Sequence, residues 1–599
     1  MCKRTKSVLC AAAALVLALS GISGSVSFLP LTEDISASAE VSTGKCGDNV
    51  SYELNDGVLT IYGTGDMYNY NYGLSPWMFD SNKITDVVIE SGVTSVGDSA
   101  FYGFSKLKNV SLAGSVTSIG NYAFCVSGLK SISIPGTVSV ISEGAFSGCG
   151  SLEKVVLGSG VSEIGNEAFS GCLKLKDVEF PSSIIEVGSS AFSLTEWQAD
   201  LKQASGNDHL AIVKGFLLDG SGASGAVSIP SGVKNICGAA FSNCTGITSV
   251  TLLSGLEAVG DYAFENCTAL TAVNFNSDLT ELGAGAFANC KALKSVALPN
   301  GLNGLSYGVF SGCSSLSAVT FGNKVSHISG NAFRDCKALK SIELPEGLIS
   351  IAEYAFNDCT SLENISFPET VESIGTTAFE STKWFTNKKH ISPVIIVNKI
   401  VVSGKSAKGL VVLPQGTMTI SDNAFAGAAG ITGVIMPESI AYIGEGAFLD
   451  CPGMTSVTIP SGVSSIGDAA FGFATKKLTG EPAAVNNFTV RCVANTEGAR
   501  YASESGLLSE FYNNDGKKAV VVKSAAAEVS PANFKVTLYE NGKAVKTVVP
   551  DANGVVDLSS IKKAESGDNS GFEQDGENGY EMVISCPDFA SIAPITLPY

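Results

Sequence analysis

Residues 152–175 read LEKVVLGSGVSEIGNEAFSGCLKL, and close variants of this stretch follow one another along the chain. Their most regular marker is the dipeptide Ala-Phe, which usually returns after 23 residues and once takes the form Val309-Phe310. A fixed period in the twenties is typical of a solenoid, because such a unit cannot bury a core alone and stacks on its neighbours. The repeat Phe lies at 101, 124, 146, 169, 192, 241, 264, 287, 310, 333, 356, 379, 425, 448 and 471.

Each unit contains a short strand followed by a turn. In the quoted unit Val155 and Leu157 stand two residues apart, which is the spacing of one face of a half-buried strand. Proline commonly follows this strand, as at Pro135 and Pro230, and ends it because proline has no N–H for the ladder. The Val-x-x-Ile-Gly stretch then turns the chain onto a second wall, and Ala-Phe brings a large ring inward. The pattern predicts a mostly β solenoid of parallel, stacked short strands with ladders of identical side chains inside.

A family resemblance is carried by segments such as residues 129–149, LKSISIPGTVSVISEGAFSGC. This segment resembles the BspA-like leucine-rich repeat of bacterial surface proteins, and the resemblance extends over residues 84–475. It implies a leucine-rich-repeat solenoid in a secreted or surface-attached bacterial protein that serves adhesion and protein binding.

The first 39 residues are predicted to be a signal peptide. Lys3, Arg4 and Lys6 form a basic start, residues 8–19 are apolar, and Ala37-Ser38-Ala39 offers a cleavage site. Export to the extracellular space or the cell surface is therefore expected. No later apolar run is long enough for a membrane helix, so no membrane insertion is expected after cleavage.

The solenoid, at 84–475, is expected to lie between two caps, because an open sheet end exposes backbone and core. An N-terminal β cap is predicted at 40–83, with a hairpin turn at Asn55-Asp56-Gly57. A C-terminal cap is predicted at 476–515, with a strand at 488–492 and an amphipathic helix at 497–511. Residues 516–599 predict a small β-sandwich domain, similar to transthyretin-like modules, with strands at 520–522, 535–539, 544–549, 555–558 and 580–585.

Two places skip one Ala-Phe and begin alike, near 193–230 and near 380–414. The first follows Phe192-Ser-Leu-Thr-Glu-Trp197 and the second follows Phe379-Glu-Ser-Thr-Lys-Trp384. Both are interpreted as variant double rungs that carry a surface loop. The loops are expected to be exposed over 198–208 and 385–392.

Cysteine stands three residues after the repeat Phe in nine units. A metal site needs converging ligands such as a C-x-x-C pair, and the sequence has none, so neither a metal nor a cofactor is predicted. Disulfides between adjacent rungs are possible, but free buried thiols are favoured because Ser127 and Ala428 fill the same position. The nine cysteines are 149, 172, 244, 267, 290, 313, 336, 359 and 451.

Catalytic patterns are sparse. The three histidines, His209, His327 and His390, are predicted to occupy loop or solvated rung positions. No G-x-S-x-G elbow is present, and the carboxylates are scattered over outward positions, so no enzyme is predicted. The net charge of −19 disfavours nucleic acid and anionic membrane surfaces as partners.

Aromatic residues provide the candidate ligand contacts. Tyr68, Tyr70 and Tyr72 would share one face of an extended segment, and Trp197 and Trp384 begin the variant rungs. Tyrosine is favoured at interfaces, whereas the nearby Trp77 is equally suited to cover the end of the core.

The leading hypothesis is a secreted or cell-surface, non-enzymatic binding or adhesion protein that presents a long solenoid surface to extracellular protein or glycan ligands. The alternatives are the targeting arm of an exported glycan- or cell-wall-acting hydrolase and a passive surface scaffold. The pattern specifies no oligomeric state.

Overall fold

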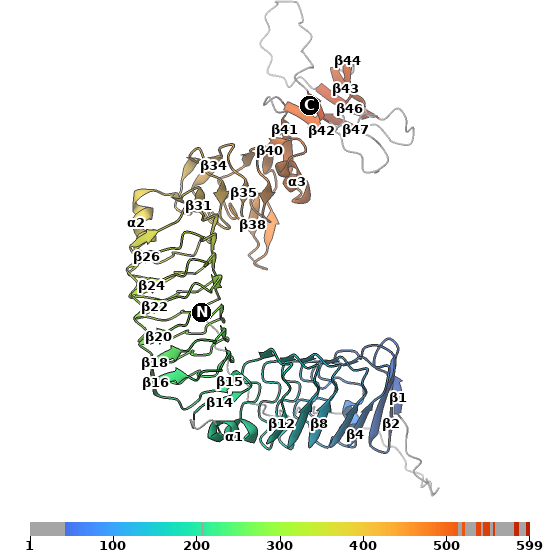
Figure 1. Ribbon diagram of the computed structural model, residues 1–599. Helices are drawn as coiled ribbons and strands as arrows, with labels where there is room; N and C mark the ends of the chain where they lie inside the picture. Colours follow the sequence, from blue (N-terminus) through green and yellow to red (C-terminus); the bar gives the residue numbers. More distant parts are fainter. Residues whose placement is uncertain are drawn as a thin grey trace, which may run out of the picture.

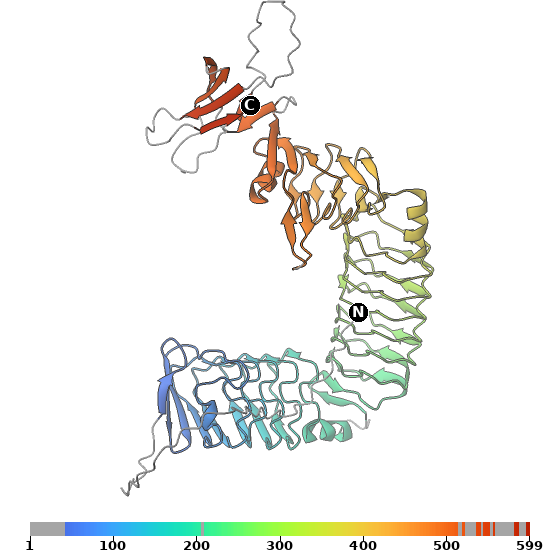
Figure 2. The same cartoon turned by 180° about the vertical axis from the view of Figure 1, so that it is seen from behind.

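The chain folds as a bent solenoid, seen from two sides in Figures 1 and 2. Three straight arms join at two corners and form a C. The predicted signal peptide at 1–39 lies outside the residues that the structure describes. In this computed structural model those residues are 42–204, 209–477, 479–512, 518–521, 535–540, 543–550, 555–557, 580–585 and 595–598.

Each rung, meaning one coil of the solenoid, contributes a long strand and a short strand. The long strand β10 (Lys154–Leu157) pairs in parallel with β8 (Ser131–Ile134), and the short strand β11 (Glu163–Ile164) pairs with β9 (Val140–Ile141). Long strands lie on the outer side of the C and short strands on its inner side (Figure 1). The predicted fold, a mostly β leucine-rich-repeat solenoid of parallel short strands, is confirmed.

The remaining long strands continue the outer face through the three arms. They are β4 (Asp86–Ile89), β6 (Asn109–Leu112), β12 (Asp177–Glu179), β16 (Gly225–Ile229), β18 (Ile247–Leu252), β20 (Ala272–Asn274), β22 (Ser295–Ala297), β24 (Ala318–Thr320), β26 (Ser341–Glu343), β28 (Asn364–Ser366), β32 (Gly409–Val412), β34 (Ile431–Ile435), β36 (Ser456–Ile459) and β40 (Thr489–Val493).

The short strands line the inner face. They are β5 (Ser95–Val96), β7 (Ser118–Ile119), β13 (Glu186–Val187), β15 (Phe216–Asp219), β17 (Asn235–Ile236), β19 (Ala258–Val259), β21 (Glu281–Leu282), β23 (Gly304–Leu305), β25 (His327–Ile328), β27 (Ser350–Ile351), β29 (Ser373–Ile374), β31 (Ile400–Ser403), β33 (Thr419–Ile420), β35 (Tyr442–Ile443) and β37 (Ser465–Ile466).

The repeat Phe rings stack on one another inside each arm. Phe146 and Phe169, for example, have ring centroids 5.2 Å apart and planes within 1° of parallel. The stack is interrupted at both corners, and the buried apolar side chains accordingly form three clusters. Gly220 and Gly404 lie at the interruptions, because a Cβ there would come within 2.0 Å and 1.9 Å of the next rung's Phe ring.

Both corners begin with a helix, α1 (Glu196–Ala204) and α2 (Lys383–Ile391), where surface loops were predicted. The expected exposure is found at 386–391, whereas residues 205–208 of the first predicted loop lie outside the described residues. The cause of the second helix is visible at Thr382, which replaces the usual cysteine three residues after Phe379. Its hydroxyl donates to the Phe379 carbonyl at 2.7 Å and accepts the Phe385 N–H at 3.0 Å, which caps α2. The hairpins β14 (Ala211–Val213) with β15 and β30 (Ile395–Val397) with β31 then return the chain to the inner face.

The N-terminal stretch is an antiparallel hairpin extension of the outer sheet. Strands β1 (Ser42–Lys45), β2 (Val50–Asn55) and β3 (Val58–Gly63) are antiparallel, and β3 pairs in parallel with β4. A short 3-10 helix, η1 (Met78–Asp80), precedes the first rung.

The C-terminal helix is shorter than predicted. α3 (Glu497–Glu504) is followed by strand β41 (Leu508–Tyr512), which pairs in parallel with β40, so residues 508–511 are not helical. A hairpin of β38 (Phe473–Thr475) and β39 (Pro482–Ala484) precedes them.

The last strands fall into two sheets. β42 (Lys518–Val521) and β45 (Val555–Asp557) extend the sheet of β41. A separate antiparallel sheet contains β43 (Lys535–Glu540), β44 (Lys543–Val548), β46 (Tyr580–Ser585) and β47 (Ile595–Pro598). The β-sandwich, the two caps and the domain limits stay predictions.

Every cysteine in the described residues is free and buried, which confirms the predicted thiol ladder there. Along the ladder each thiol but one donates to the carbonyl of the Phe in the preceding rung, as Cys313 does to Phe287 at 3.2 Å, while Cys244 donates to the carbonyl of Gly220 at the first corner. The thiols therefore serve as small core residues whose polar atom is satisfied.

Candidate binding surface

Three tyrosine rings, one exposed and two half-buried, form a platform at the start of the first arm. Tyr72 is 59% exposed, and its ring contacts those of Tyr102 and Tyr122 edge-on, at centroid distances of 5.0 and 5.5 Å. The three come from the stretch before the first rung and from two successive rungs. Edge-on contacts of this kind are favourable and hold the rings in place. Tyr72, Tyr102 and Tyr122 are named the tyrosine platform.

Tyr122 is positioned by the backbone of its own rung and by the next one. It lies two residues before Phe124 with φ at +54°, in the left-handed turn that recurs at this point of the rung. Gly144 occupies the same point one rung later, and the Tyr122 ring lies over it. The Tyr122 hydroxyl donates to Glu143. That hydrogen bond is the main cause that raises the pKa of Tyr122, with burial and the Glu143 and Glu167 charges adding to it.

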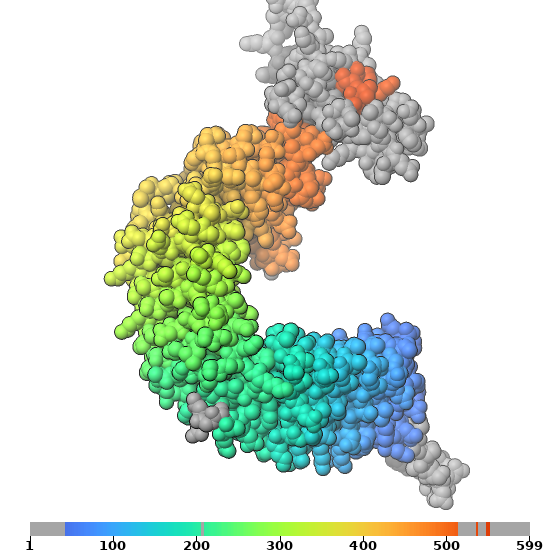
Figure 3. Space-filling view, in the orientation of Figure 1, coloured from blue at the N-terminus to red at the C-terminus, as the bar shows by residue number. Residues whose placement is uncertain are grey.

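An acidic groove adjoins the platform on the inner face. It has a cavity volume of about 280 Å³, and its lining includes Glu143, Glu163 and Glu186 together with Asn121 and Asn166. Glu163 of β11 pairs directly with Glu186 of β13. Figure 3 shows the inner side of the first arm, in blue and teal, facing the open space within the C.

Apolar side chains border the platform along the chain. Leu74 and Met78 are exposed, and Phe79 is 95% exposed. Together these residues offer exposed apolar area that a partner could cover.

The predicted tyrosines do not share one exposed face. Tyr68 is exposed and donates to Asp48 Oδ1 at 2.9 Å. Tyr70 turns inward onto Trp77, at a centroid distance of 5.9 Å, and its buried hydroxyl has no hydrogen-bond partner in the described part of the chain. Trp77 is buried and stacks on Phe101, so it covers the end of the core.

The two corner tryptophans are packing residues with a small exposed edge. Trp197 is 8% exposed, and its ring centroid lies 4.7 Å from that of Phe192. Trp384 is 7% exposed, and its ring centroid lies 5.2 Å from that of Phe379. A ligand could reach only the edge of either indole.

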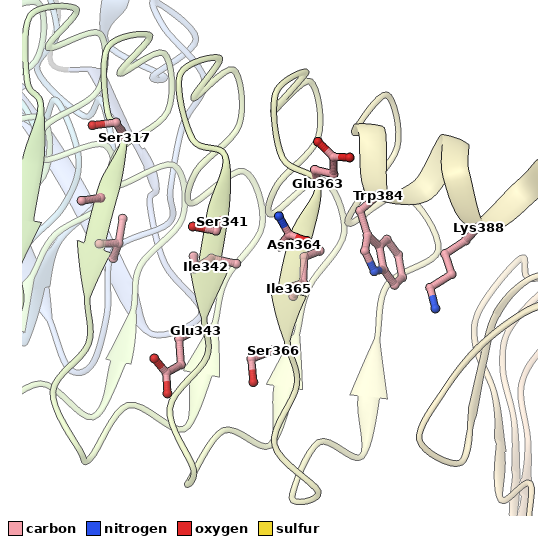
Figure 4. Close-up of a pocket in the computed structure, with 12 residues that line it drawn as sticks. Ser317, Ser341, Ile342, Glu343, Glu363, Asn364, Ile365, Ser366, Trp384 and Lys388 are labelled. Carbon is pink, nitrogen blue, oxygen red and sulfur yellow. The ribbon is translucent and has the colours of Figure 1, made fainter.

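The edge of Trp384 borders a second hollow, the α2 groove, on the outer face. Figure 4 shows Glu343, Asn364 and Ser366 on adjacent strands, with Trp384 and Lys388 coming from α2. The groove has a cavity volume of about 730 Å³. Lys388 Nζ lies 5.9 Å from the Trp384 ring centroid and covers part of the indole.

The sequence did not reveal Tyr102, Tyr122 and Glu143 as members of one surface. Their signal is positional: Tyr122 and Glu143 fall two and three residues before a repeat Phe, where the rung turns outward. Aligning the repeats by their Phe and searching these columns for aromatic residues would have found Tyr122.

Within the residues that the structure describes, no group of three or more His, Cys, Asp or Glu side chains is placed to hold a metal ion. Among the same residues, no helix has the length and apolar character that crossing a bilayer requires.

Comparison with known proteins connects this architecture to one repeat family. A family model described as a BspA type leucine rich repeat region matches residues 74–196, 221–340, 326–401 and 403–497. No curated protein matches the chain.

Solved structures with similar folds include two bacterial leucine-rich repeat proteins. The protein from Eubacterium ventriosum ATCC 27560 is 26% identical, with 57% of this chain and 95% of that chain covered and a TM-score of 0.37. The protein from Bacteroides ovatus ATCC 8483 is 21% identical, with coverages of 65% and 99% and a TM-score of 0.27. The pneumococcal vaccine antigen PcpA is 18% identical, with coverages of 56% and 98% and a TM-score of 0.29.

Proposed function

The chain belongs to the BspA type leucine-rich-repeat family, and on that premise we propose that it is a secreted or cell-surface binding protein without catalytic activity. Its ligand is an extracellular protein, and the tyrosine platform is the centre of the contact. Repeat solenoids provide extended concave surfaces for such contacts.

One observation carries the proposal: the exposed ring of Tyr72 is connected to the half-buried rings of Tyr102 and Tyr122 on a stack of rungs. Tyrosine gives a large contact area at low entropic cost and is enriched among the residues that dominate binding energy. Because Tyr122 lies over Gly144, the platform needs little ordering when a ligand arrives.

The neighbouring apolar residues favour a protein over a glycan. Leu74 and Phe79, two and seven residues after Tyr72, add exposed area that carries no hydrogen-bonding group. Apolar area contributes to the binding free energy when an apolar group of the ligand covers it, and a protein surface supplies such groups more readily than a sugar does.

The test is affinity capture on arrays of extracellular proteins and of glycans, with residues 40–599 as the probe. A Tyr72→Ala/Tyr102→Ala variant is compared with Tyr262→Ala/Tyr307→Ala, which removes two exposed tyrosines from the middle arm. Loss of each residue of the platform is expected to weaken capture by about tenfold, as for a contact worth about 1.4 kcal/mol. The control variant should capture as the unmodified protein does.

Three results would contradict the proposal. Equal capture by both variants would remove the platform from the site. Substrate turnover that is lost on changing one carboxylate would instead support the targeting arm of a hydrolase. Self-association seen by light scattering, with no array ligand captured, would support a passive scaffold.

A further inference from the structure

We propose that the partner presents a lysine- or arginine-rich segment, which lies along the tyrosine platform and the acidic groove. This rests on the proposed function and names the chemistry of the partner. The segment is extended, because platform and groove follow one another along the axis of the first arm through successive rungs.

Charge is segregated across the first arm. Between residues 86 and 192 the sequence has no arginine, and its lysines all fall in the long strands or the turns just before them, at 106, 108, 130, 154, 174 and 176. The remaining part of each rung, which includes the inner face, carries carboxylates without any basic residue. Those carboxylates are Glu90, Asp98, Glu143, Glu163, Glu167 and Glu186.

On the outer face of the same arm, two neighbouring carboxylates are neutralised by a lysine of the adjacent strand. Lys154 Nζ lies 2.8 Å from Asp177 Oδ2 and 3.0 Å from Glu179 Oε1, so one cation serves both. On the inner face Glu163 and Glu186 stand on paired strands, about 4.8 Å apart by sheet geometry. Neither has an ion-pair partner among the residues that the structure describes.

Like charges directly opposite one another on a sheet are destabilising. A cation from outside would relieve this repulsion, because the inner face supplies none of its own. The groove is therefore electrostatically incomplete without a basic ligand. Its carboxylates do not converge as metal ligands do within the described residues, which favours a row of charges over a single ion.

The platform supplies the second element that a basic segment requires. The faces of tyrosine rings attract ammonium and guanidinium groups, and Glu143 joins the platform to the groove through the Tyr122 hydroxyl. The methylene stems of lysine and arginine can lie on the exposed ring of Tyr72 while their charged ends point toward Glu143. The aromatic rings thus suit the methylene stem of a basic side chain, and the carboxylates beyond them suit its charged end.

The experiment measures binding of fluorescent peptides to residues 40–599. The probes are a lysine–serine, an arginine–serine and a glutamine–serine peptide of equal length. The groove variant is Glu143→Gln/Glu163→Gln/Glu186→Gln. The control variant is Glu346→Gln/Glu369→Gln/Glu372→Gln, which makes the same change in net charge at exposed positions of the middle arm.

Both basic peptides should bind the unmodified protein, and their affinity should fall as salt is added because the contacts are ionic. The groove variant is expected to lose about tenfold in affinity and the control variant less than about twofold. A Glu163→Asp/Glu186→Asp variant keeps the charge and should retain most of the binding. The melting temperature of the groove variant should not fall, since the change removes a repulsion.

Equal losses in the groove and control variants would overturn the proposal, because binding would then follow net charge alone. Failure of both basic peptides to bind would overturn it as well. If array capture depends on Tyr72 and Tyr102 but survives the groove variant, the proposed function stands and the basic partner is wrong. If capture depends on neither the platform tyrosines nor the groove carboxylates, the proposed function and the basic partner are both wrong.

Discussion

The ring of Tyr122 lies directly over Gly144 of the next rung, where a Cβ would come within 2.3 Å of the ring atom Cε1. The exposed aromatic surface is thus built into the repeat, because a glycine in one rung makes room for a tyrosine of the rung before it.

Replacing Gly144 by alanine should therefore displace Tyr122 and weaken ligand capture by about tenfold, because the Cβ and the ring cannot share the space. The φ of +58° adds a backbone cost of about 1–2 kcal/mol for any residue with a Cβ. Gly308→Ala is the matched control, since Gly308 has φ of +62° at the same point of its rung and an open side. Similar melting temperatures with unequal capture would support the relationship; equal capture would refute it.

At the second corner, Thr382→Ala should destabilise the protein by about 1–2 kcal/mol, because α2 loses its N-cap. Thr382→Ser keeps the hydroxyl that bonds Phe379 and Phe385 and should cost far less. Urea unfolding followed by circular dichroism measures both. Equal costs for Ala and Ser would show that the methyl packing, not the cap, holds the corner.

Gly404→Ala should cost about 1–3 kcal/mol, since its Cβ would come within 1.9 Å of Phe425 Cε1. Gly114→Ala, which meets nothing within 4 Å, is the control and should stay within about 0.5 kcal/mol of the unmodified protein. If both variants unfold at the same urea concentration, Gly404 is not the residue that lets the Phe stack end.

Alkaline pH should destabilise the fold through the thiol ladder. Burial raises the pKa of Cys267 and Cys313 to about 12. A folded pKa above the unfolded value means that stability is complete below about pH 8.5 and falls as pH rises toward about 12. Each buried thiol contributes a slope of about 1.4 kcal/mol per pH unit in that window.

Urea midpoints measured from neutral pH to pH 10 test this expectation. A Cys267→Ala/Cys313→Ala variant should start less stable and show a shallower decline. A decline of the same steepness in both proteins would assign the alkaline loss to other groups.

The solenoid could be predicted because its rule is local and repeated. Val155 and Leu157 occupy the alternate, buried positions of one strand. Because the same spacing recurs in rung after rung, the pattern of one unit was enough to predict β10 and its neighbours. The thiol ladder followed for the same reason, since Cys172 and its equivalents hold one position relative to the repeat Phe.

The positions of the corners were predicted, but their helices were missed because the signal for each helix is a single residue. Thr195 and Thr382 replace the ladder cysteine and turn the chain into α1 and α2. Helices of nine residues have too few apolar repeats to reveal themselves. They are held by Trp197 and Trp384, which pack on the last Phe of each stack.

The tyrosine platform was missed for a different reason. It joins Tyr72 to Tyr102 and Tyr122, residues 30 and 50 positions away, and only the stacking of rungs brings them together. The alternation of Tyr68, Tyr70 and Tyr72 suggested an extended strand, but no strand forms there and Tyr70 instead fills the space beside Trp77.

The interruption of the Phe stack at both corners also bears on how the molecule responds to mechanical load. Each arm has its own cluster of buried side chains, so tension applied to the ends of the chain would be resisted by three yielding units in series. A chain built this way is expected to lengthen in steps under tension, one arm at a time, rather than to yield as a whole.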